Sequence, residues 1–373
     1  HMDMPMLAIK TPQTWFHQSG IRHDAGKYIA PLTQHILIIT SVKAWAQVNP
    51  ALEDSLRASG IRWQTEIMTG YCTEEGVARY VQRAKKLGIT FIVGVGGGKV
   101  LDTAKAVADL LEGGESVTIP TIAATCAAWS PLAVFYTSEG AQISSQALRT
   151  MPRLVLVDSE IIARSDVRYL KAGIVDALAK WYEFRPYLQK NPDNLGLQLK
   201  VQNARLAVDI FARHGEQAIR DNKAQVVSDA LVNVIDACIA VAGMANSVRG
   251  EIPTPGVAHA IHNRLTQEPA LLRWLHGERV GFSLLVQSIL ENDNSQPDPQ
   301  LLALLRQYEM PLTLAPLKEI RLAVIQAVAR SIPFPREAAE YLPFSLEPSR
   351  IEQALRLTEQ YVSTRAYARD LTE

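Results

Sequence analysis

Apolar and polar residues follow two different rhythms along this chain. Up to about residue 160, short apolar, β-branched runs alternate with stretches of helical periodicity. The runs typical of strands are residues 35–40, 62–68, 91–95, 117–120, 134–137 and 154–158, and the helical stretches are residues 41–48, 74–87 and 100–111. Strands that alternate with helices predict parallel βα units.

Helical periodicity dominates the rest of the chain, and proline and glycine mark the joints. The predicted helices cover roughly residues 168–186, 195–220, 222–246, 256–264, 276–292, 298–307, 317–330 and 348–369. We therefore predict an α/β nucleotide-binding domain over residues 3–160 and an all-helical domain over residues 161–373. In such two-part enzymes, ligands usually bind between the domains.

Three consecutive glycines, Gly96, Gly97 and Gly98, connect the apolar run 91–95 to the helical stretch 100–111. Without Cβ atoms, the backbone can approach a phosphate, and the free N–H groups of a helix N-terminus attract it. A tight structural turn is the alternative. The spacing differs from the G-x-G-x-x-G of the ordinary dinucleotide fold, but a strand, a glycine turn and a helix together predict a phosphate site.

Composition and charge narrow the function classes. The 38 basic residues (lysine plus arginine) equal the 38 acidic residues (aspartate plus glutamate) in number, so the formal net charge is zero. The chain therefore lacks the excess of positive charge typical of proteins that bind nucleic acid or an anionic membrane. No apolar run approaches the ~20 residues of a membrane span. The widely spaced Cys72, Cys126 and Cys238 fit a reducing compartment. We expect a cytoplasmic protein that binds neither nucleic acid nor a membrane.

One carboxylate and two imidazoles stand in three predicted helices of the second half. Asp176 lies in Ala-Gly-Ile-Val-Asp, His259 in Ala-His-Ala-Ile-His-Asn, and His276 in His-Gly-Glu. Such a set can hold a divalent metal and leave one position open for a substrate oxygen. Each histidine taken singly is more often an ordinary core or surface residue.

These motifs together resemble the glycerol dehydrogenase branch of the iron-containing alcohol dehydrogenase superfamily. Residues 94–105 resemble its cofactor loop, residues 120–132 resemble its nicotinamide loop, and the three acid and histidine segments resemble its metal-ligand segments in the same order. The likeness runs from about residue 30 to about residue 360. It is strongest to the bacterial hydroxycarboxylate dehydrogenases, which share Ala-Thr-Cys-Ala-Ala-Trp and Ala-Lys-Trp-Tyr-Glu.

The resemblance implies a Rossmann-like N-terminal domain and an all-α C-terminal domain, the fold also found in dehydroquinate synthases. It implies one divalent metal, held by Asp176, His259 and His276, and a nicotinamide cofactor in the cleft between the domains. Carried over by position, the cofactor contacts are Gly96, Gly97, Gly98, Lys99, Asp102, Thr121, Ala124, Ser130, Leu132 and Tyr136. We expect a small-molecule substrate and a homo-oligomer.

The chain departs from the family beside the substrate. Cys126 stands where glycerol dehydrogenases have an aspartate that holds the polyol, and a thiol accepts only weak hydrogen bonds. Cys126 as a small packing residue is the alternative, and Trp129 of the same loop is a further candidate substrate residue. Lys180 stands where iron-dependent members have a fourth ligand, a histidine, which favours zinc over iron. Lys180 can pair with a substrate carboxylate or phosphate, or it can be a lysine whose stem packs and whose head is solvated.

Further departures concern the cofactor and the metal. Where NAD-preferring members have an acid after the first strand, this chain has Thr-Ser41-Val-Lys43. A hydroxyl and a cation suit a 2′-phosphate, which favours NADP(H) over NAD(H); an N-cap Ser41 with a surface Lys43 is the alternative. Val175 and Arg264 replace glycines usual in the family, and their bulk could narrow the pocket or weaken metal binding.

The predicted reaction is reversible hydride transfer between NAD(P)(H) and a 2-oxo acid or a related aldehyde or ketone, with the metal as Lewis acid. His262, one turn after His259, relays the proton or orients a metal ligand. A polyol, glycerol or glycerol-phosphate dehydrogenase is the alternative among oxidoreductases. A lyase or cyclase of the dehydroquinate synthase type is the alternative from another class, and a metal-free pseudoenzyme is a third.

Overall fold

The computed structural model describes residues 5–361 in two compact units. An α/β unit consists of Ile9–Ile174 and Leu206–Val248, and a helical unit consists of the described residues within His1–Ala8, Val175–Arg205 and Arg249–Glu373. These units do not follow the predicted boundary at residue 160. Helices α7 (Val167–Lys190) and α8 (Leu195–Lys223) each run unbroken from one unit into the other, so hydrophobic periodicity gives no sign of the change.

The α/β unit is built on a parallel sheet of six strands in the order β2-β9-β6-β5-β3-β4. All its neighbouring strands are parallel, as the alternation of strands and helices predicts. The strands are β2 (Trp15–His17), β3 (His35–Thr40), β4 (Arg62–Ile67), β5 (Phe91–Gly96), β6 (Glu115–Pro120) and β9 (Leu154–Val157). The short edge strand β2 was not predicted.

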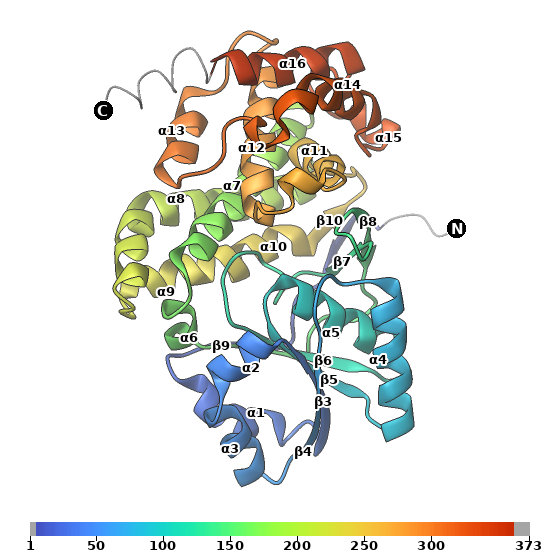
Figure 1. Ribbon diagram of the computed structural model, residues 1–373, viewed down its shortest axis with the longest axis vertical. Helices are drawn as coiled ribbons and strands as arrows, with labels where there is room; N and C mark the ends of the chain where they lie inside the picture. The colour runs from blue at the N-terminus through green and yellow to red at the C-terminus, as the bar shows by residue number, and fades with distance from the viewer. Residues whose placement is uncertain (1–4, 362–373) are drawn as a thin grey trace. The chain divides into compact units, whose positions relative to one another are not determined.

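Helices cover both faces of this sheet (Figure 1). Ile36 and Ile38 of β3 pack in one core with residues of α1 (Ala25–Ile29) and α3 (Ala51–Ala58). The alternate residues Leu37 and Ile39 pack in the other core, with α4 (Glu74–Leu87) and α5 (Gly98–Leu110). Because both faces are buried, β3 is apolar from Ile36 to Ile39, which is why the pattern identifies it.

The chain order reverses between β3 and β5, which lie side by side. Helix α2 (Val42–Val48) follows β3, and α5 follows β5. At the carboxyl ends of the two strands, the Thr40 hydroxyl donates to the carbonyl of Val95 at 2.7 Å. In open parallel sheets, ligands bind outside the carboxyl ends at such a switch point. The predicted cofactor residues Ser41 and Gly96 both lie there.

The predicted strand 134–137 does not join the parallel sheet. It is part of β7 (Leu132–Tyr136), which pairs with β8 (Gln142–Ala147) as a separate antiparallel hairpin. No helix separates β7 from β8, so the chain has no crossover with which to place them in parallel. Another small sheet pairs β1 (Leu7–Ile9) with β10 (Val248–Gly250).

The later helices largely match their predicted spans, except that two short helices, Ser159–Ala163 and Arg336–Ala339, were not predicted. They are α6 (Ser159–Ala163), α9 (Asp229–Asp236), α10 (Ala242–Ser247), α11 (Val257–Leu265), α12 (His276–Glu291), α13 (Pro299–Gln307), α14 (Arg321–Ser331), α15 (Arg336–Ala339) and α16 (Pro348–Tyr361). The predicted helix 222–246 is wrong at its start: α8 continues to Lys223, and Ser228 caps α9 by accepting from the amide of Leu231. The end of the predicted helix 348–369 lies outside the described residues.

Helix α12 forms the centre of the helical unit. Each residue from Gly277 to Leu290 is buried. Phe282, Val286 and Ile289 belong to a core that also takes residues from α11, α14 and α16. A helix buried on every side holds its neighbours at fixed positions, and α12 therefore sets the place of its first residue, His276.

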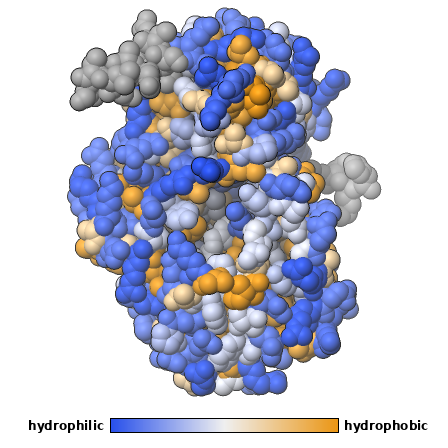
Figure 2. Space-filling model, in the orientation of Figure 1, coloured by the Kyte–Doolittle hydropathy of each residue, from blue (hydrophilic) through white to orange (hydrophobic). Residues whose placement is uncertain are grey.

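One apolar stretch is longer than the sequence analysis expected, since no run was expected to approach the length of a membrane span. Asp229–Ser247, which runs through α9, the π-helical turn η2 (Ala237–Val241) and α10, is long and apolar enough to cross a membrane by length and composition. Of an 18-residue window within this stretch, 61% is buried, which is what the core helix of a folded unit shows. The face seen in Figure 2 is mostly hydrophilic, and its apolar side chains gather in small patches.

Candidate active site

The three predicted metal-ligand side chains come together in the helical unit. Asp176 belongs to α7, His259 to α11, and His276 begins α12. The Oδ1 atom of Asp176 lies 3.1 Å from Nε2 of His276 and 3.6 Å from Nε2 of His259. One ligand atom from each residue lies within 4.8 Å of the other two. The structure therefore brings the three side chains together, which the sequence alone could not establish.

These atoms fit a divalent metal ion. Asp176 is only 4% exposed, and its buried Oδ1 has no hydrogen-bond partner although two imidazole nitrogens face it. A buried carboxylate oxygen without a hydrogen bond is costly unless a cation compensates it. One carboxylate oxygen and two imidazole nitrogens make a three-ligand set that zinc and related ions accept.

Glu183 fixes the orientation of His259, and sequence reasoning missed it. The Nδ1 atom of His259 lies 2.7 Å from Oε1 of Glu183, and the backbone amide of His259 donates to Oε2 at 3.0 Å. With Nδ1 engaged by the carboxylate, Nε2 points toward Asp176 as a ligand must. Glu183 follows Asp176 by two helical turns on α7, and this spacing is the signal that could have revealed it.

Gly256 makes room for that carboxylate. It is the N-cap of α11, and a Cβ there would lie 1.6 Å from Oε2 of Glu183. Because glycine has no side chain to cap the helix, the N-terminal amide of His259 takes its acceptor from Glu183 instead. The glycine and the glutamate thus serve one purpose, which is to place His259.

Charge in the cluster is distributed unevenly. Burial alone would raise the pKa of Asp176, but His276, Lys180 and His259 hold it well below its usual range. Burial alone would lower the pKa of His259, but Glu183 and Asp176 raise it to about 9. Since a metal ligand must offer a lone pair, metal binding here displaces a proton from the site.

His262 lies beside the ligands as a neutral imidazole. It is fully buried, and its ring centroid lies 4.4 Å from that of His276. Burial, followed by the nearby His276 and Arg279, lowers its pKa well below the usual range. Its Nδ1 contacts the side-chain oxygen of Asn263 at 3.0 Å, and its buried Nε2 has no hydrogen-bond partner. A neutral imidazole in this position can accept a proton or orient its neighbour.

Two buried lysines accompany the cluster. Lys180, one turn after Asp176, is 5% exposed, and Lys200 of α8 is also 5% exposed. The ammonium of Lys200 lies 4.4 Å from the ring centroid of Phe184, which stands one turn after Lys180. Burial, then Arg249 and Lys180, lowers the pKa of Lys200 to about 7. Lys180 therefore places a positive charge next to the predicted metal ligand Asp176, whereas Lys200 loses its own charge more readily than an exposed lysine.

Other contacts accommodate Val175 and Arg264, whose bulk was expected to narrow the pocket or weaken metal binding. Val175 is fully buried, and its Cγ1 would lie 3.0 Å from a Cβ at Gly281 of α12. The absence of a side chain at Gly281 therefore leaves room for the Val175 side chain. The Nε atom of Arg264 donates to Ser331 at 2.8 Å, and its Nη1 donates to Glu268 at 3.1 Å.

In the α/β unit, the glycine loop has the geometry of a close helix–strand junction. Gly96 ends β5 with φ of 157°, and a Cβ there would lie 3.0 Å from Val100. Gly97 is the N-cap of α5, and a Cβ on it would come 2.9 Å from Ile122. Gly98 is the first residue of α5. The predicted phosphate site thus lies at a helix N-terminus, at the end of a buried strand.

Asp102 and Lys105 tie α5 to the loop after β6. The ammonium of Lys105 donates to the carbonyls of Ser130 at 3.0 Å and Leu132 at 2.7 Å, and lies 3.2 Å from Oδ1 of Asp102. Oδ2 of Asp102 accepts from the amide of Val134 at 3.2 Å. Lys105 was not singled out in the sequence. Its contacts fix three predicted cofactor residues, Asp102, Ser130 and Leu132, relative to one another.

Aromatic rings border the same loop. The ammonium of Lys99 lies 4.2 Å from the ring centroid of Tyr71, and the rings of Tyr71 and Tyr136 are 5.4 Å apart. Gly140 lets Tyr71 approach, since a Cβ there would meet the ring at 2.7 Å. Tyr71 is therefore a neighbour of Lys99 and Tyr136, two predicted cofactor residues. The sequence did not indicate Tyr71 itself.

The predicted nicotinamide loop is packed within the α/β unit. The amide of Thr121 donates to the carbonyl of Gly96 at 3.1 Å. A Cβ at Gly173 would lie 1.8 Å from the carbonyl of Ala123 and 3.2 Å from Ala124, so α7 needs glycine at this crossing. The structure places Thr121 and Ala124 beside the glycine loop and α7, respectively.

Cys126 and Trp129 contact α10. The side-chain amide of Asn246 lies 3.6 Å from the Cys126 sulfur, and the indole N–H of Trp129 donates to Ser247 at 2.9 Å. Both loop residues are buried, at 6% and 5% exposed. The Trp129 ring leaves no room for a Cβ on Gly243, which would lie 2.4 Å away. These contacts fix the loop, and Asn246 becomes a neighbour of Cys126, a candidate substrate residue.

Ser41 and Lys43 follow β3 as predicted. The Ser41 hydroxyl caps α2 by accepting from the amide of Ala44 at 3.2 Å, which is the structural role considered as the alternative. Lys43 is exposed, with its ammonium 5.8 Å from the ring centroid of Tyr169. The lysine is thus the more accessible of the two for an anionic group.

Known proteins resemble this chain over nearly all of its length. The model of the iron-containing alcohol dehydrogenase family matches residues 12–159. Hydroxycarboxylate dehydrogenase A of Escherichia coli is 37% identical over 79% of this chain and 82% of its own length. A glycerol dehydrogenase of Pseudomonas putida is 33% identical over 95% of this chain and 97% of its own. The crystal structure of a probable glycerol dehydrogenase from Sinorhizobium meliloti has a TM-score of 0.84 and 28% identity, covering 96% and 99% of the two chains. These similarities confirm the predicted fold class, a Rossmann-type sheet followed by a mostly helical part.

Proposed function

The chain belongs to the iron-containing alcohol dehydrogenase family, and we propose that its substrate is a small 2-oxo acid, which it reduces to the 2-hydroxy acid. Its relatives make it a metal-dependent, nicotinamide-linked oxidoreductase that acts on alcohol groups. The observation that carries the substrate class is buried Lys180, one helical turn after Asp176. A fixed positive charge there favours a carboxylate next to the reacting carbonyl.

In this mechanism, Asp176, His259 and His276 would hold a divalent ion, which would supply Lewis-acid polarisation of the substrate's carbonyl or hydroxyl oxygen. A bound nicotinamide cofactor would supply or accept the hydride. Lys180 orients the substrate through its carboxylate. His262, kept neutral by burial, holds or accepts the proton at Nε2. Zinc suits the three-ligand set, because Lys180 replaces the fourth ligand of iron-dependent relatives.

Lys180→Ala is expected to raise KM for a 2-oxo acid by about 30-fold or more, because removing one partner of a buried charge pair costs about 2 kcal/mol or more. KM for a neutral aldehyde of similar size should change only a few-fold. Steady-state kinetics with both substrates measures the difference. Lys190→Ala, at the exposed end of the same helix, is the control and should change neither. Equal effects on both substrates would remove the carboxylate role.

The proposed cofactor is NADP(H), with Lys43 placed to meet the 2′-phosphate. Lys43→Ala is expected to raise the Kd for NADPH by about 10-fold, the loss of one hydrogen bond to a charged group, and to leave that for NADH unchanged. Fluorescence titration with both cofactors measures this. The exposed Lys27→Ala, on α1, is the matched control. An unchanged cofactor preference in Lys43→Ala would refute this assignment.

A polyol or glycerol-phosphate dehydrogenase is the second candidate, because glycerol dehydrogenases are among the relatives. Cys126 beside Asn246 argues against glycerol, since neither a thiol nor an amide replaces the strong acceptor of a carboxylate. Faster turnover of glycerol or its phosphate than of 2-hydroxy acids, in the oxidation direction, would favour this candidate.

The proposal also includes a cytoplasmic homo-oligomer. Cys72, Cys126 and Cys238 are all buried and form no disulfide within the part of the chain that the structure describes, which suits a reducing compartment. Light scattering of the purified protein measures the oligomeric state directly.

A further inference from the structure

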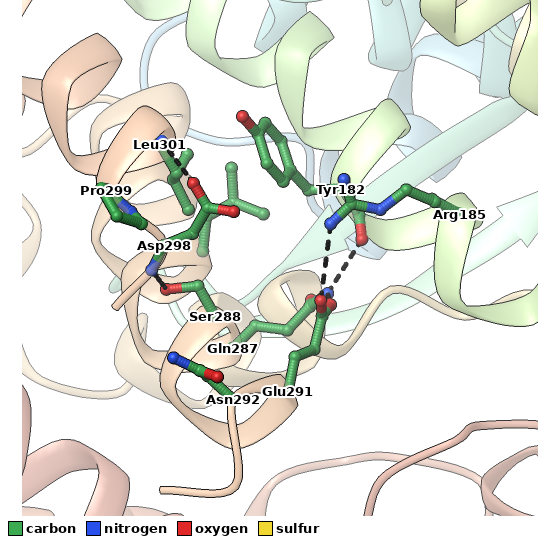
Figure 3. A pocket seen from close by; sticks show the side chains of 10 residues that line it. Tyr182, Arg185, Gln287, Ser288, Glu291, Asn292, Asp298, Pro299 and Leu301 are labelled. Atoms are coloured by element: carbon green, nitrogen blue, oxygen red, sulfur yellow. Dashed lines mark hydrogen bonds and ion pairs between the residues drawn. The ribbon is translucent and has the colours of Figure 1, made fainter. Parts of the chain in front are cut away.

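Gln287 of α12 contacts two of the helices that carry the proposed metal ligands, while its own helix carries the third. It is 2% exposed. Its Oε1 accepts from the amide of Ala258, which directly precedes His259 on α11, at 3.1 Å. Its Nε2 donates to the carbonyl of Tyr182, which directly precedes Glu183 on α7, at 3.0 Å. Figure 3 shows this side chain between α7 and α12.

The two backbone groups that Gln287 contacts both lack a partner in their own helices. The carbonyl of Tyr182 would normally accept from the amide four residues later, but that residue is Pro186, which has no N–H. Ala258 is the second residue of α11, so its amide belongs to the unpaired first turn. The glycine N-cap of α11 gives no side-chain cap either.

Only a carboxamide of this length satisfies both groups. It offers one acceptor to Ala258 and two donors, of which the second reaches Oε1 of Glu291 at 2.7 Å. An ionised glutamate would place a carboxylate against the Tyr182 carbonyl and the Glu291 carboxylate. A methionine would fill the space but leave both backbone groups without partners.

We infer that Gln287 is a positioning residue for the metal centre, which it serves through the backbone next to His259 and Glu183. It fixes α11 and α7 against α12, so that Nε2 of His259, Oδ1 of Asp176 and Nε2 of His276 converge. This inference rests on the proposed metal site. The adjoining cavity of about 320 Å³ is lined by the polar Tyr182, Arg185 and Glu291 and by the apolar Leu284 and Leu301, so packing around the amide is incomplete on this side.

The test is the affinity and geometry of Co²⁺ in the apo-protein, measured by equilibrium dialysis and visible absorption, with thermal unfolding in parallel. Gln287→Met is expected to weaken Co²⁺ binding by about 10- to 100-fold, as for other residues that orient metal ligands, and to alter the d–d bands. Gln287→Glu should do the same. Ser288→Ala, the neighbour that accepts from the amide of Asp298, is the control and should bind Co²⁺ normally.

A second substitution separates positioning from general destabilisation. Pro186→Ala restores an amide donor for the Tyr182 carbonyl, so Gln287→Met with Pro186→Ala should recover part of the lost Co²⁺ affinity. Normal affinity and an unchanged spectrum in both Gln287 variants would overturn the inference, and so would a loss that Pro186→Ala does not relieve. His276→Ala is the reference for the metal site itself. Normal Co²⁺ binding in His276→Ala would contradict the metal-site assignment itself. Normal Co²⁺ binding in the Gln287 variants, with binding lost in His276→Ala, would contradict only the positioning role of Gln287.

Discussion

Replacing His276 by alanine is expected to abolish metal binding and to lower reductase activity by at least about 1,000-fold, because Lewis-acid stabilisation contributes several kcal/mol to such reactions. His276 contributes Nε2 at 3.1 Å from Asp176, and α12 begins with it. Removing the ring leaves one imidazole and one carboxylate, which hold a divalent ion weakly. Metal analysis of the purified variant and NADPH-linked kinetics measure both effects.

The control for this variant is His23→Ala. His23 is exposed and belongs to the α/β unit, so its loss should leave both metal content and activity unchanged. The wild-type protein should carry about one divalent ion per chain. Full metal content in both His259→Ala and His276→Ala would show that the three-ligand assignment is wrong.

The second large effect concerns Glu183. Glu183→Gln keeps the volume of the side chain but removes the carboxylate that accepts from both the ring and the backbone of His259. Metal affinity should fall by about 10- to 100-fold, as for other residues that orient a ligating histidine. Competition with a chromophoric chelator measures this affinity. Overall stability should change less, because the amide oxygen still accepts one hydrogen bond.

Glu268→Gln is the matched control for Glu183→Gln. Glu268 also belongs to the helical unit and also pairs with a basic side chain, Arg264, at 3.1 Å. Its substitution should leave metal affinity unchanged. Equal affinity losses in the two variants would mean that Glu183 acts only through general stability, and its orienting role would be withdrawn.

The sequence predicted most of what depends on local pattern. β3, β5, α4 and α5 are found where apolar runs and helical periodicity place them, because each buries a regular face. The short edge strand β2 was missed, since three residues carry too little periodicity. The boundary between units was missed because α7 and α8 run through it.

The residues of the candidate site also fall into those that the sequence identified and those that it missed. Asp176, His259 and His276 were identified from segments that match a family pattern. Glu183 and Gln287 were missed because their partners lie 76 and 105 residues away in sequence, where only tertiary structure brings them together. Pro186 and Gly256 are the local signs that were available: each leaves a helical backbone group unpaired, which another element must satisfy.

The measurement that tests the central claim most directly is the absorbance of reduced nicotinamide while the purified protein acts on a 2-oxo acid, before and after metal removal by a chelator. Metal-dependent, net oxidation of NADPH that matches the 2-hydroxy acid formed is the predicted result. Net oxidation should stop after chelation and return when zinc is added. No net consumption of NADPH or NADH with any 2-oxo acid, aldehyde or ketone would contradict the account and favour a lyase or cyclase that regenerates its cofactor.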